Sequence, residues 1–282
     1  MENIRIPRIM RETSKRHLHN GRTIGFVPTM GALHEGHISL IKRAKSENDI
    51  VVVSIFVNPT QFGPNEDFDK YPRDLERDME KLRKEEVHIL FMPDVGAMYP
   101  EGFSSYITVR GLSDKLCGVF RSGHFTGVAT IVCKLFNIVK PTAAYFGQKD
   151  FQQAVIIKRM IEDLNMDVNL IICPTVREND GLAMSSRNVY LSKEERIAAT
   201  VIFRTLLSAS QAIKSGITNP VDVSKHMHDM LMAEPLISEI QYAGVYDVNT
   251  FDELNEFKKQ NLIAVAVKIG STRLIDNIIV EF

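Results

Sequence analysis

Short apolar runs alternate with helix-like stripes through the first two thirds of the chain. Residues 49–57 form a continuous β-branched run, which is typical of a strand buried on both faces. Shorter runs of the same kind occupy residues 23–27 (ending at Pro28), 88–91, 143–146 and 168–172. Between these runs, apolar side chains recur every three or four residues, as on one face of a helix, at residues 75–86, 128–139 and 155–164. This alternation predicts a parallel sheet with right-handed crossovers and helices on both faces.

The pattern changes after about residue 175. Ser192 and Glu195 have the spacing of a capping box, which predicts the start of a long helix running through Lys214. A second helix is predicted at residues 221–232, and three antiparallel strands at residues 239–248, 262–269 and 274–282. We therefore predict the α/β class, with a Rossmann-like parallel sheet domain over residues 1–175 and a smaller α+β domain over residues 176–282.

Composition narrows the class of protein. The 282 residues include 34 Lys and Arg against 35 Asp and Glu, so charge gives no reason to expect nucleic acid or an anionic membrane as a partner. No apolar run approaches the ~18 residues of a membrane-spanning helix, and the first residues lack the apolar stretch of a signal peptide. Cys117, Cys133 and Cys173 are odd in number and far apart, which favours reduced thiols. We expect a cytoplasmic protein.

The segment after the first predicted strand carries the densest chemistry. Gly31 and Gly36 have the glycine spacing of a phosphate loop, but His37 and Ile38 stand where that loop needs Lys and Ser or Thr. A strand, a glycine-rich turn and a helix start offer backbone N–H groups to an anion, and His34 and His37 can both face one phosphate. The alternatives are a plain turn with two solvent-facing histidines, or a metal site one residue short of the zinc-protease motif. We favour phosphate binding.

A resemblance to known proteins rests on this segment and on motifs that follow it in order. His34-Glu35-Gly36-His37 matches the His-x-Gly-His signature of the nucleotidyltransferase superfamily. Further matching motifs lie at residues 26–33, 56–62, 71–73, 98–100, 121–128, 146–150 and 184–188. The ordered set resembles the pantoate–β-alanine ligase family over most of residues 26–190.

The resemblance implies an activity and its partners. A member of this family condenses (R)-pantoate with β-alanine to pantothenate through a pantoyl adenylate, and AMP and pyrophosphate leave. Mg²⁺ would accompany ATP, and the family implies a homodimer. The family also has an acidic metal position in the helix after residues 71–73, but here Arg77 precedes Asp78, so we assign no protein ligand to a metal.

The resemblance also implies which residues form the site. The catalytic candidates, which would offset charge on the phosphates, are His34, His37, Lys149 and Arg187. The ATP-binding candidates are Met30, Gly31, Ala32, Leu33, His34, Glu35, Gly36, His37, Gly147, Gln148, Lys149, Asp150, Val176, Met184, Ser185, Ser186 and Arg187. Gln61 and Gln153 are the pantoate candidates, because a neutral amide can bond both a hydroxyl and a carboxylate, and Gln61 also borders β-alanine. Arg121 and His124 are placed near the site.

Two other functions fit parts of the pattern. A nucleotidyltransferase would leave the adenylyl group on its acceptor, and it needs a basic acceptor pocket rather than two glutamines. A nucleotide sensor without activity would be expected to lack some of the four catalytic candidates, and all four are present.

Overall fold

The computed structural model describes residues 1–64 and 66–282, which divide into two compact units. Unit 1 contains residues 1–113, 121–148 and 153–174. Unit 2 contains residues 114–120, 149–152 and 175–282. The smaller C-terminal part is therefore joined by two short segments that come from earlier in the sequence.

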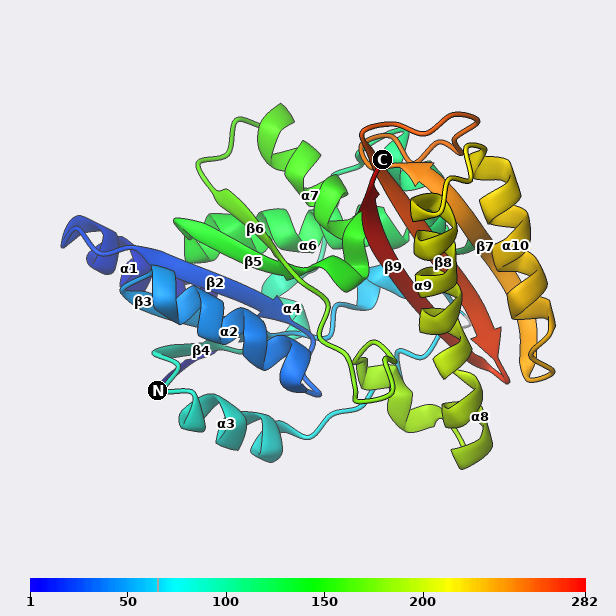
Figure 1. Cartoon of the computed structure of the whole chain (residues 1–282). Coiled ribbons are helices and arrows are strands. Elements are labelled where there is room, and N and C mark those ends of the chain that lie inside the picture. Colours follow the sequence, from blue (N-terminus) through cyan, green and yellow to red (C-terminus); the bar gives the residue numbers. More distant parts are fainter. Residues whose placement is uncertain (65) are drawn as a thin grey trace. The chain divides into compact units, whose positions relative to one another are not determined.

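Unit 1 is built on the parallel sheet that the apolar runs predict. The strand order is β1-β4-β3-β2-β5-β6, and every pairing is parallel. The strands are β1 (Glu2–Ile4), β2 (Ile24–Thr29), β3 (Ile50–Ile55), β4 (Ile89–Phe91), β5 (Ala143–Gly147) and β6 (Asn169–Cys173) (Figure 1). The five predicted strands are confirmed. The three-residue edge strand β1 is too short to leave an apolar pattern in the sequence.

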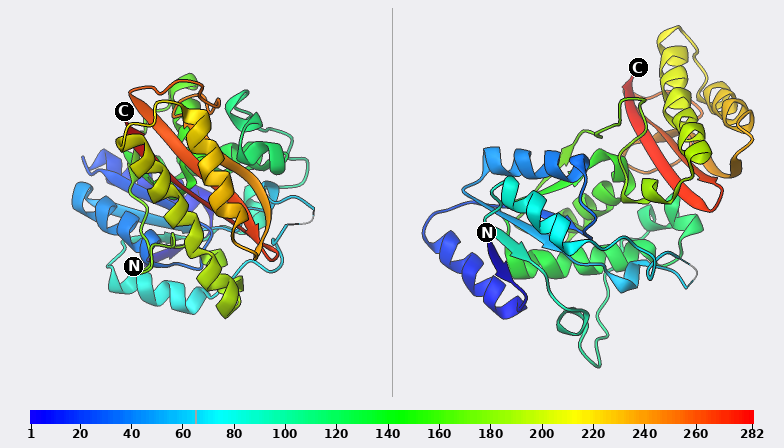
Figure 2. Two further views of the ribbon diagram at one scale, coloured as in Figure 1. Left: turned by 45° about the vertical axis from the view of Figure 1, so that its right-hand side comes forward. Right: turned by 90° about the horizontal axis from the view of Figure 1, so that it is seen from below.

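Helices cover both faces of this sheet. The helix α2 (Glu35–Glu47) packs on β2, β3 and β5. On the opposite face, α1 (Pro7–His19) packs against α6 (His124–Val139), which contacts β2 (Figure 2). The other helices whose residues lie mainly in unit 1 are α3 (Leu75–Lys84), α4 (Val95–Met98) and α7 (Phe151–Asp163). Two-sided covering explains why the strand residues read as continuous apolar runs.

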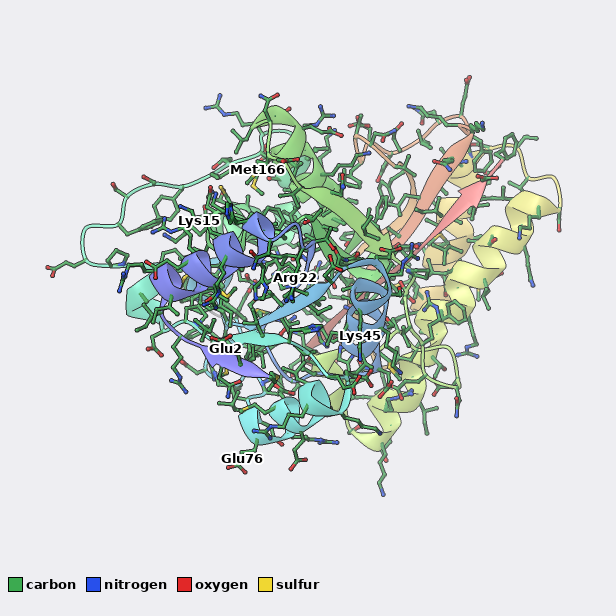
Figure 3. All side chains as sticks on the ribbon, turned by 90° about the vertical axis from the view of Figure 1, so that its left-hand side faces the viewer. Glu2, Lys15, Arg22, Lys45, Glu76 and Met166 are labelled. Carbon is green, nitrogen blue, oxygen red and sulfur yellow. The ribbon has the colours of Figure 1, made fainter. Side chains whose placement is uncertain are left out.

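Several charged side chains of unit 1 lie on its surface. Arg22, Lys45 and Glu76 are all exposed, and Figure 3 shows Glu76 projecting outward from the molecule. In the part of the chain that the structure describes, no helix combines the length and the apolar character that crossing a membrane requires.

The strand order places a topological switch point beside β2. The chain runs from β2 to β3 on one side, whereas β5 pairs with the other side of β2. Open α/β sheets bind ligands at the carboxyl ends of the strands at such a point. A ligand site is therefore expected at the turn after β2 and the segment after β5.

Pro28 does not end the first long strand as we predicted, because β2 continues through it to Thr29. The Thr29 carbonyl accepts from the Phe56 N–H on the β3 side, so Pro28 turns its nitrogen toward β5. The β5 ladder pairs only with Gly25 and Phe26. Because Pro28 lies beyond the end of that ladder, its missing N–H removes no hydrogen bond to β5.

Unit 2 contains an antiparallel sheet, the four-residue helix α5 (Cys117–Phe120) and three further helices, two of which pack on the sheet. The sheet order is β7 (Ile237–Asp247), β8 (Gln260–Ile269) and β9 (Thr272–Glu281). The further helices are α8 (Lys193–Ala198), α9 (Thr200–Lys214) and α10 (Pro220–Met232), and α9 and α10 bury their apolar faces against β7 and β8. One continuous helix through Lys214 was predicted, and the break at Ala199 shows this to be wrong. There the Thr200 hydroxyl donates to the Ile197 carbonyl at 2.8 Å, which competes with the regular helix bonds.

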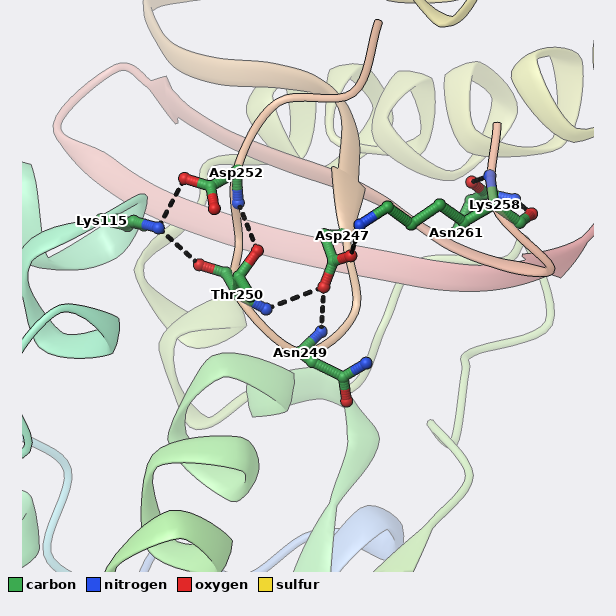
Figure 4. A network of polar contacts seen from close by, with 7 residues as sticks. All are labelled: Lys115, Asp247, Asn249, Thr250, Asp252, Lys258 and Asn261. Atoms are coloured by element: carbon green, nitrogen blue, oxygen red, sulfur yellow. Dashed lines mark hydrogen bonds and ion pairs between the residues drawn. The ribbon is translucent and has the colours of Figure 1, made fainter. Parts of the chain in front are cut away.

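The turn after β7 ties residues 114–120 into unit 2. The Asp247 carboxylate accepts from the N–H groups of Asn249 and Thr250 at 2.7 and 2.9 Å and also pairs with Lys258 (Figure 4). Lys115 donates to the Thr250 carbonyl at 2.9 Å and forms an ion pair with Asp252. These bonds explain why a segment remote in sequence belongs to this unit.

Candidate active site

A tight turn follows β2 and leads into α2. Gly31 and Ala32 both have left-handed backbone conformations, with φ of 85° and 51°. A Cβ at Gly31 would lie 3.1 Å from Asp78 Oδ2 and 3.2 Å from a methyl carbon of Ile55. The position therefore needs glycine for its conformation and for its close surroundings.

Asp78 of α3 holds this turn from inside. Its side chain is buried, and its two oxygens accept from the N–H groups of Ala32 and Leu33, each at 2.8 Å. Lys81, one helical turn later, donates to the Leu33 carbonyl. Burial raises the pKa of the Asp78 carboxyl, and the two N–H groups act in the opposite direction. These bonds from α3 fix the backbone that precedes the two histidines.

The histidine pair forms the N-terminal cap of α2. His34 Nδ1 accepts from the Gly36 N–H at 3.2 Å, and His37 Nδ1 accepts from the His34 N–H at 3.3 Å. Because a backbone N–H donates to each Nδ1, each neutral ring carries its proton on Nε2. The ring centres are 4.1 Å apart. The cap thus presents two Nε2–H donors from neighbouring rings, beside the positive end of the α2 dipole.

Gln61 ends the short 3₁₀ helix η1 (Pro59–Gln61), which follows β3, and its amide is held on both sides. Asn58 Nδ2 donates to Gln61 Oε1 at 3.1 Å, and Gln61 Nε2 lies 3.0 Å from Met30 Sδ. Tyr99 in turn donates to Asn58 Oδ1 at 2.7 Å. The structure therefore brings the predicted residues Met30 and Gln61 together, and adds Asn58 and Tyr99 as their supports.

A second chain of polar contacts reaches Gln61 from the start of α6. His124 Nδ1 lies 2.8 Å from the Gln61 carbonyl oxygen, so this nitrogen is the donor, and Arg121 donates to His124 Nε2 at 3.0 Å. Arg121 Nε also donates to Glu66 Oε1 at 2.7 Å. Burial is the largest single influence on the pKa of Glu66 and raises it, but Arg121, the Gly63 backbone and His124 together outweigh burial, so the net pKa is lowered. These contacts orient the backbone that carries Gln61.

The remaining predicted residues of unit 1 lie at or after the end of β5. Gly147 is the last residue of β5, and Gln148 follows it directly. Gln153 lies half-buried on the first turn of α7. No hydrogen bond of the described residues joins Gln153 to Gln61, although both were predicted to hold one substrate.

The other predicted residues belong to unit 2. The Lys149 carbonyl accepts from Asn277 Nδ2 at 3.0 Å, and Lys149 Nζ lies 3.8 Å from Asp150 Oδ2. The Met184 N–H donates to the Val176 carbonyl at 3.0 Å, which brings these two predicted positions side by side. The predicted residues Ser185, Ser186 and Arg187 come next along the chain. Ser185 is the N-cap of the 3₁₀ helix η4 (Ser186–Tyr190), and its Oγ accepts from the Arg187 N–H at 3.2 Å.

The acidic side chains near the turn can be compared with the needs of a metal ion through their positions and hydrogen bonds. Across residues 1–64 and 66–282, no group of three or more His, Cys, Asp or Glu side chains is placed to hold one. The acidic position that the family resemblance offers, Asp78, directs both oxygens at backbone N–H groups of the turn. An inner-sphere metal bond there would have to replace these hydrogen bonds.

Comparison with known proteins decides the family. The family model described as pantoate-beta-alanine ligase matches residues 2–279. The chain belongs to the pantoate–β-alanine ligase family. It is 65% identical over 281 residues to the pantothenate synthetase of Thermodesulfovibrio yellowstonii, and the match covers 100% of both chains. The chain is accordingly an enzyme of the ligase class that serves pantothenate biosynthesis.

Solved structures agree with this membership. The crystal structure of pantothenate synthetase from Thermus thermophilus matches with a TM-score of 0.94 and 43% identity over 99% of each chain. The pantoate-beta-alanine ligase from Francisella tularensis, solved as a complex with beta-gamma ATP and beta-alanine, matches with a TM-score of 0.81 and 37% identity. That match covers 99% of this chain and 97% of the other. The predicted fold class, a parallel α/β sheet with a smaller α+β part, is confirmed.

Proposed function

We propose that this enzyme uses ATP to condense (R)-pantoate with β-alanine, through a pantoyl adenylate. One observation supports this most: at the carboxyl end of the sheet, the cap of α2 presents two imidazole N–H donors, while the neighbouring Met30 contacts the neutral amide of Gln61. The first group suits a phosphate and the second a small hydroxy acid. The Francisella tularensis relative was solved with a form of ATP and with β-alanine.

In the first step, a carboxylate oxygen of pantoate attacks the α-phosphorus of ATP, and pyrophosphate leaves. The product is a mixed anhydride of pantoate and AMP, which turns a poor electrophile into a reactive one. We assign His34 and His37 to the phosphate oxygens that gain charge, because their Nε2–H groups are fixed in orientation by the cap.

In the second step, the amine of β-alanine attacks the acyl carbon of the adenylate, AMP leaves, and the amide bond forms. The step needs no covalent bond to the enzyme, so alignment of the two reactants supplies most of the rate. We assign Gln61 and Gln153 to pantoate and Gln61 also to the edge of the β-alanine position.

Four residues of unit 2 complete the proposal. We assign Lys149, Ser185, Ser186 and Arg187 to the phosphates of ATP, because an ammonium, a guanidinium and two hydroxyls suit phosphate oxygens. The other ATP-binding candidates named above stay predictions. Mg²⁺ enters as part of the substrate, bound to the phosphates of ATP. Homodimer formation and a cytoplasmic location also stay predictions.

Product analysis tests the proposal against a nucleotidyltransferase. With ATP, (R)-pantoate and β-alanine, we expect pantothenate, AMP and pyrophosphate in equal amounts. A nucleotidyltransferase would release pyrophosphate without free AMP, and a nucleotide sensor would release neither. Either of those results would contradict the proposal.

A further inference from the structure

We propose that Asp78 is a positioning residue for the adenylation step: it fixes the turn before His34 and His37, and it is not a metal ligand. The inference rests on the proposed function, since it names the residue that sets the geometry of the phosphate-binding cap. Asp78, the turn and both histidines all belong to unit 1.

The first support is the direction of the two hydrogen bonds. Ala32 donates to Oδ2 and Leu33 donates to Oδ1, so each oxygen of the carboxylate serves one amide. Successive N–H groups in this kind of turn form a small concave site for an anion. Here the anion is the protein's own carboxylate, so these two N–H groups act on the turn and the bound phosphate must rely on the histidines and the helix start.

The second support is the position of Asp78 on its helix. Only 2% of Asp78 is exposed, whereas Glu76, on the same helix, is exposed and points outward (Figure 3). Asp78 precedes the buried Leu82 by four residues and therefore lies on the same face of α3. A buried carboxylate is costly unless it is hydrogen-bonded, and the two amides supply those bonds.

The third support is that the turn is anchored at several atoms. Lys81 donates to the Leu33 carbonyl, and the Thr29 hydroxyl accepts from the Gly31 N–H at 3.2 Å. His34 follows Leu33 directly, and its N–H and Nδ1 both belong to the cap of α2. A shift of the turn therefore moves both imidazole rings, and a displacement near 1 Å can cost a reaction about 100-fold in rate.

The decisive variant is Asp78→Asn, with Glu76→Gln as the matched control on the same helix. An asparagine has one oxygen and one NH₂ group, so one of the two turn amides faces a donor. We expect hydrogen–deuterium exchange of the Ala32 and Leu33 amides to rise at least ~10-fold. We expect kcat for pantoate-dependent pyrophosphate–ATP exchange to fall ~10–100-fold, with the KM for pantoate within about twofold of the wild type. Glu76→Gln should change none of these.

A magnesium titration separates positioning from metal binding. A positioning role predicts that the Mg²⁺ concentration for half-maximal exchange stays within about twofold in Asp78→Asn. A rise of about tenfold or more, with recovery of rate at high Mg²⁺, would mark a metal site and overturn the inference. Unchanged amide exchange at Ala32 and Leu33 would also overturn it.

A second variant covers the case in which Asp78→Asn does not fold. Lys81→Met removes the bond to the Leu33 carbonyl and leaves the carboxylate in place. It should lower exchange kcat ~3–10-fold without changing the Mg²⁺ requirement, and an unchanged kcat would contradict the anchoring of the turn. If wild-type enzyme shows no pantoate-dependent exchange at all, the proposed function fails, while the deuterium measurement still tests the contacts of Asp78.

Discussion

His37 has two roles, in the helix cap and in phosphate binding, and a single substitution to alanine removes both at once. Its Nδ1 accepts from the His34 N–H and helps to cap α2, whereas its Nε2–H is the group that we assign to the phosphate. His37→Ala removes both. Loss of one donor to a developing charge costs ~10²–10³-fold in kcat, or about 3–4 kcal/mol. We expect that loss in pyrophosphate–ATP exchange, with a smaller effect on the binding of ATP.

His37→Gln is the matched control for the cap. A glutamine at the third helical position can return the capping bond to the His34 N–H, so the unfolding midpoint should stay near that of the wild type. Its amide does not reproduce the position of the imidazole Nε2–H, so the exchange rate should remain low. Recovery of the wild-type rate in His37→Gln would show that only the cap matters.

Gln153 tests how the enzyme recognises pantoate. A site that bonds a substrate hydroxyl discriminates against an analogue without it, because the protein group is then left unpaired. Gln153→Ala should raise the KM for pantoate at least ~10-fold and leave the KM for ATP within about twofold. It should also narrow the difference between pantoate and its deoxy analogue. Loss of ATP affinity with an unchanged pantoate-to-deoxy ratio would move Gln153 to the nucleotide site.

At the scale of elements, the close packing of α6 on η1 determines where Gln61 lies. A Cβ on Gly127 would lie 2.3 Å from the Thr60 carbonyl oxygen, whereas a Cβ on Gly96 of α4 meets no atom within 4 Å. Replacing a helical glycine by alanine normally stabilises a protein by about 0.5–1 kcal/mol. Gly127→Ala should instead lower the free energy of unfolding by about 1–3 kcal/mol, because η1 must move. It should also raise the KM for pantoate.

Gly96→Ala provides the comparison for that variant. Its free energy of unfolding should stay equal or rise slightly, and its KM for pantoate should not change. Urea denaturation and steady-state kinetics on both variants measure these quantities. Equal stability of the two variants would show that the contact between Gly127 and Thr60 does not limit the packing.

The turn after β7 gives unit 2 a dependence on pH. Burial, the largest influence, raises the pKa of Asp247, but the Lys258 bond and the N–H groups of Asn249 and Thr250 outweigh it, so the pKa is lowered. A carboxyl with a lowered folded pKa stabilises the protein above its unfolded pKa of about 3.9, and this contribution is lost as pH falls through the folded value. Asp247→Asn should therefore lower the free energy of unfolding at neutral pH by about 1–2 kcal/mol. The difference from wild type should shrink below about pH 4.

Asp252→Asn is the control for this measurement. The Asp252 side chain is 61% exposed and its partner Lys115 is 34% exposed, and such ion pairs contribute little in water. The free energy of unfolding of both variants can be measured by urea denaturation between acidic and neutral pH. It should be lower for Asp247→Asn than for Asp252→Asn at neutral pH, and the two values should converge in acid. A difference between Asp247→Asn and wild type that persists unchanged in acid would contradict the lowered pKa.

For the whole molecule, sequence patterns predicted the sheet and the strand–turn–helix segment that carries His34 and His37, because both depend on local chemistry. Strands buried on two faces leave apolar runs, and a glycine-rich turn before a helix leaves glycine and histidine at fixed spacing. The contacts of Asp78 could not be predicted in this way, since the turn that it holds lies 46 residues earlier in the sequence. Its place on the buried face of α3, four residues before Leu82, was the one signal in the sequence.

The edge strand β1, the break at Ala199 and the make-up of unit 2 were also beyond the sequence patterns. Strand β1 has three residues, and the helix break lies where the Thr200 hydroxyl bonds the Ile197 carbonyl. Residues 114–120 join unit 2 through tertiary contacts such as those of Lys115. Periodicity reports which face of an element is buried, and it carries no information on which distant segment covers that face.

Pyrophosphate–ATP exchange with one substrate at a time tests the two-step mechanism most directly. An adenylate that forms before the amine is needed predicts that (R)-pantoate alone supports exchange of labelled pyrophosphate into ATP. β-Alanine alone should give no exchange, because it has no part in the first step. Exchange that requires β-alanine, or that β-alanine supports without pantoate, would contradict the mechanism.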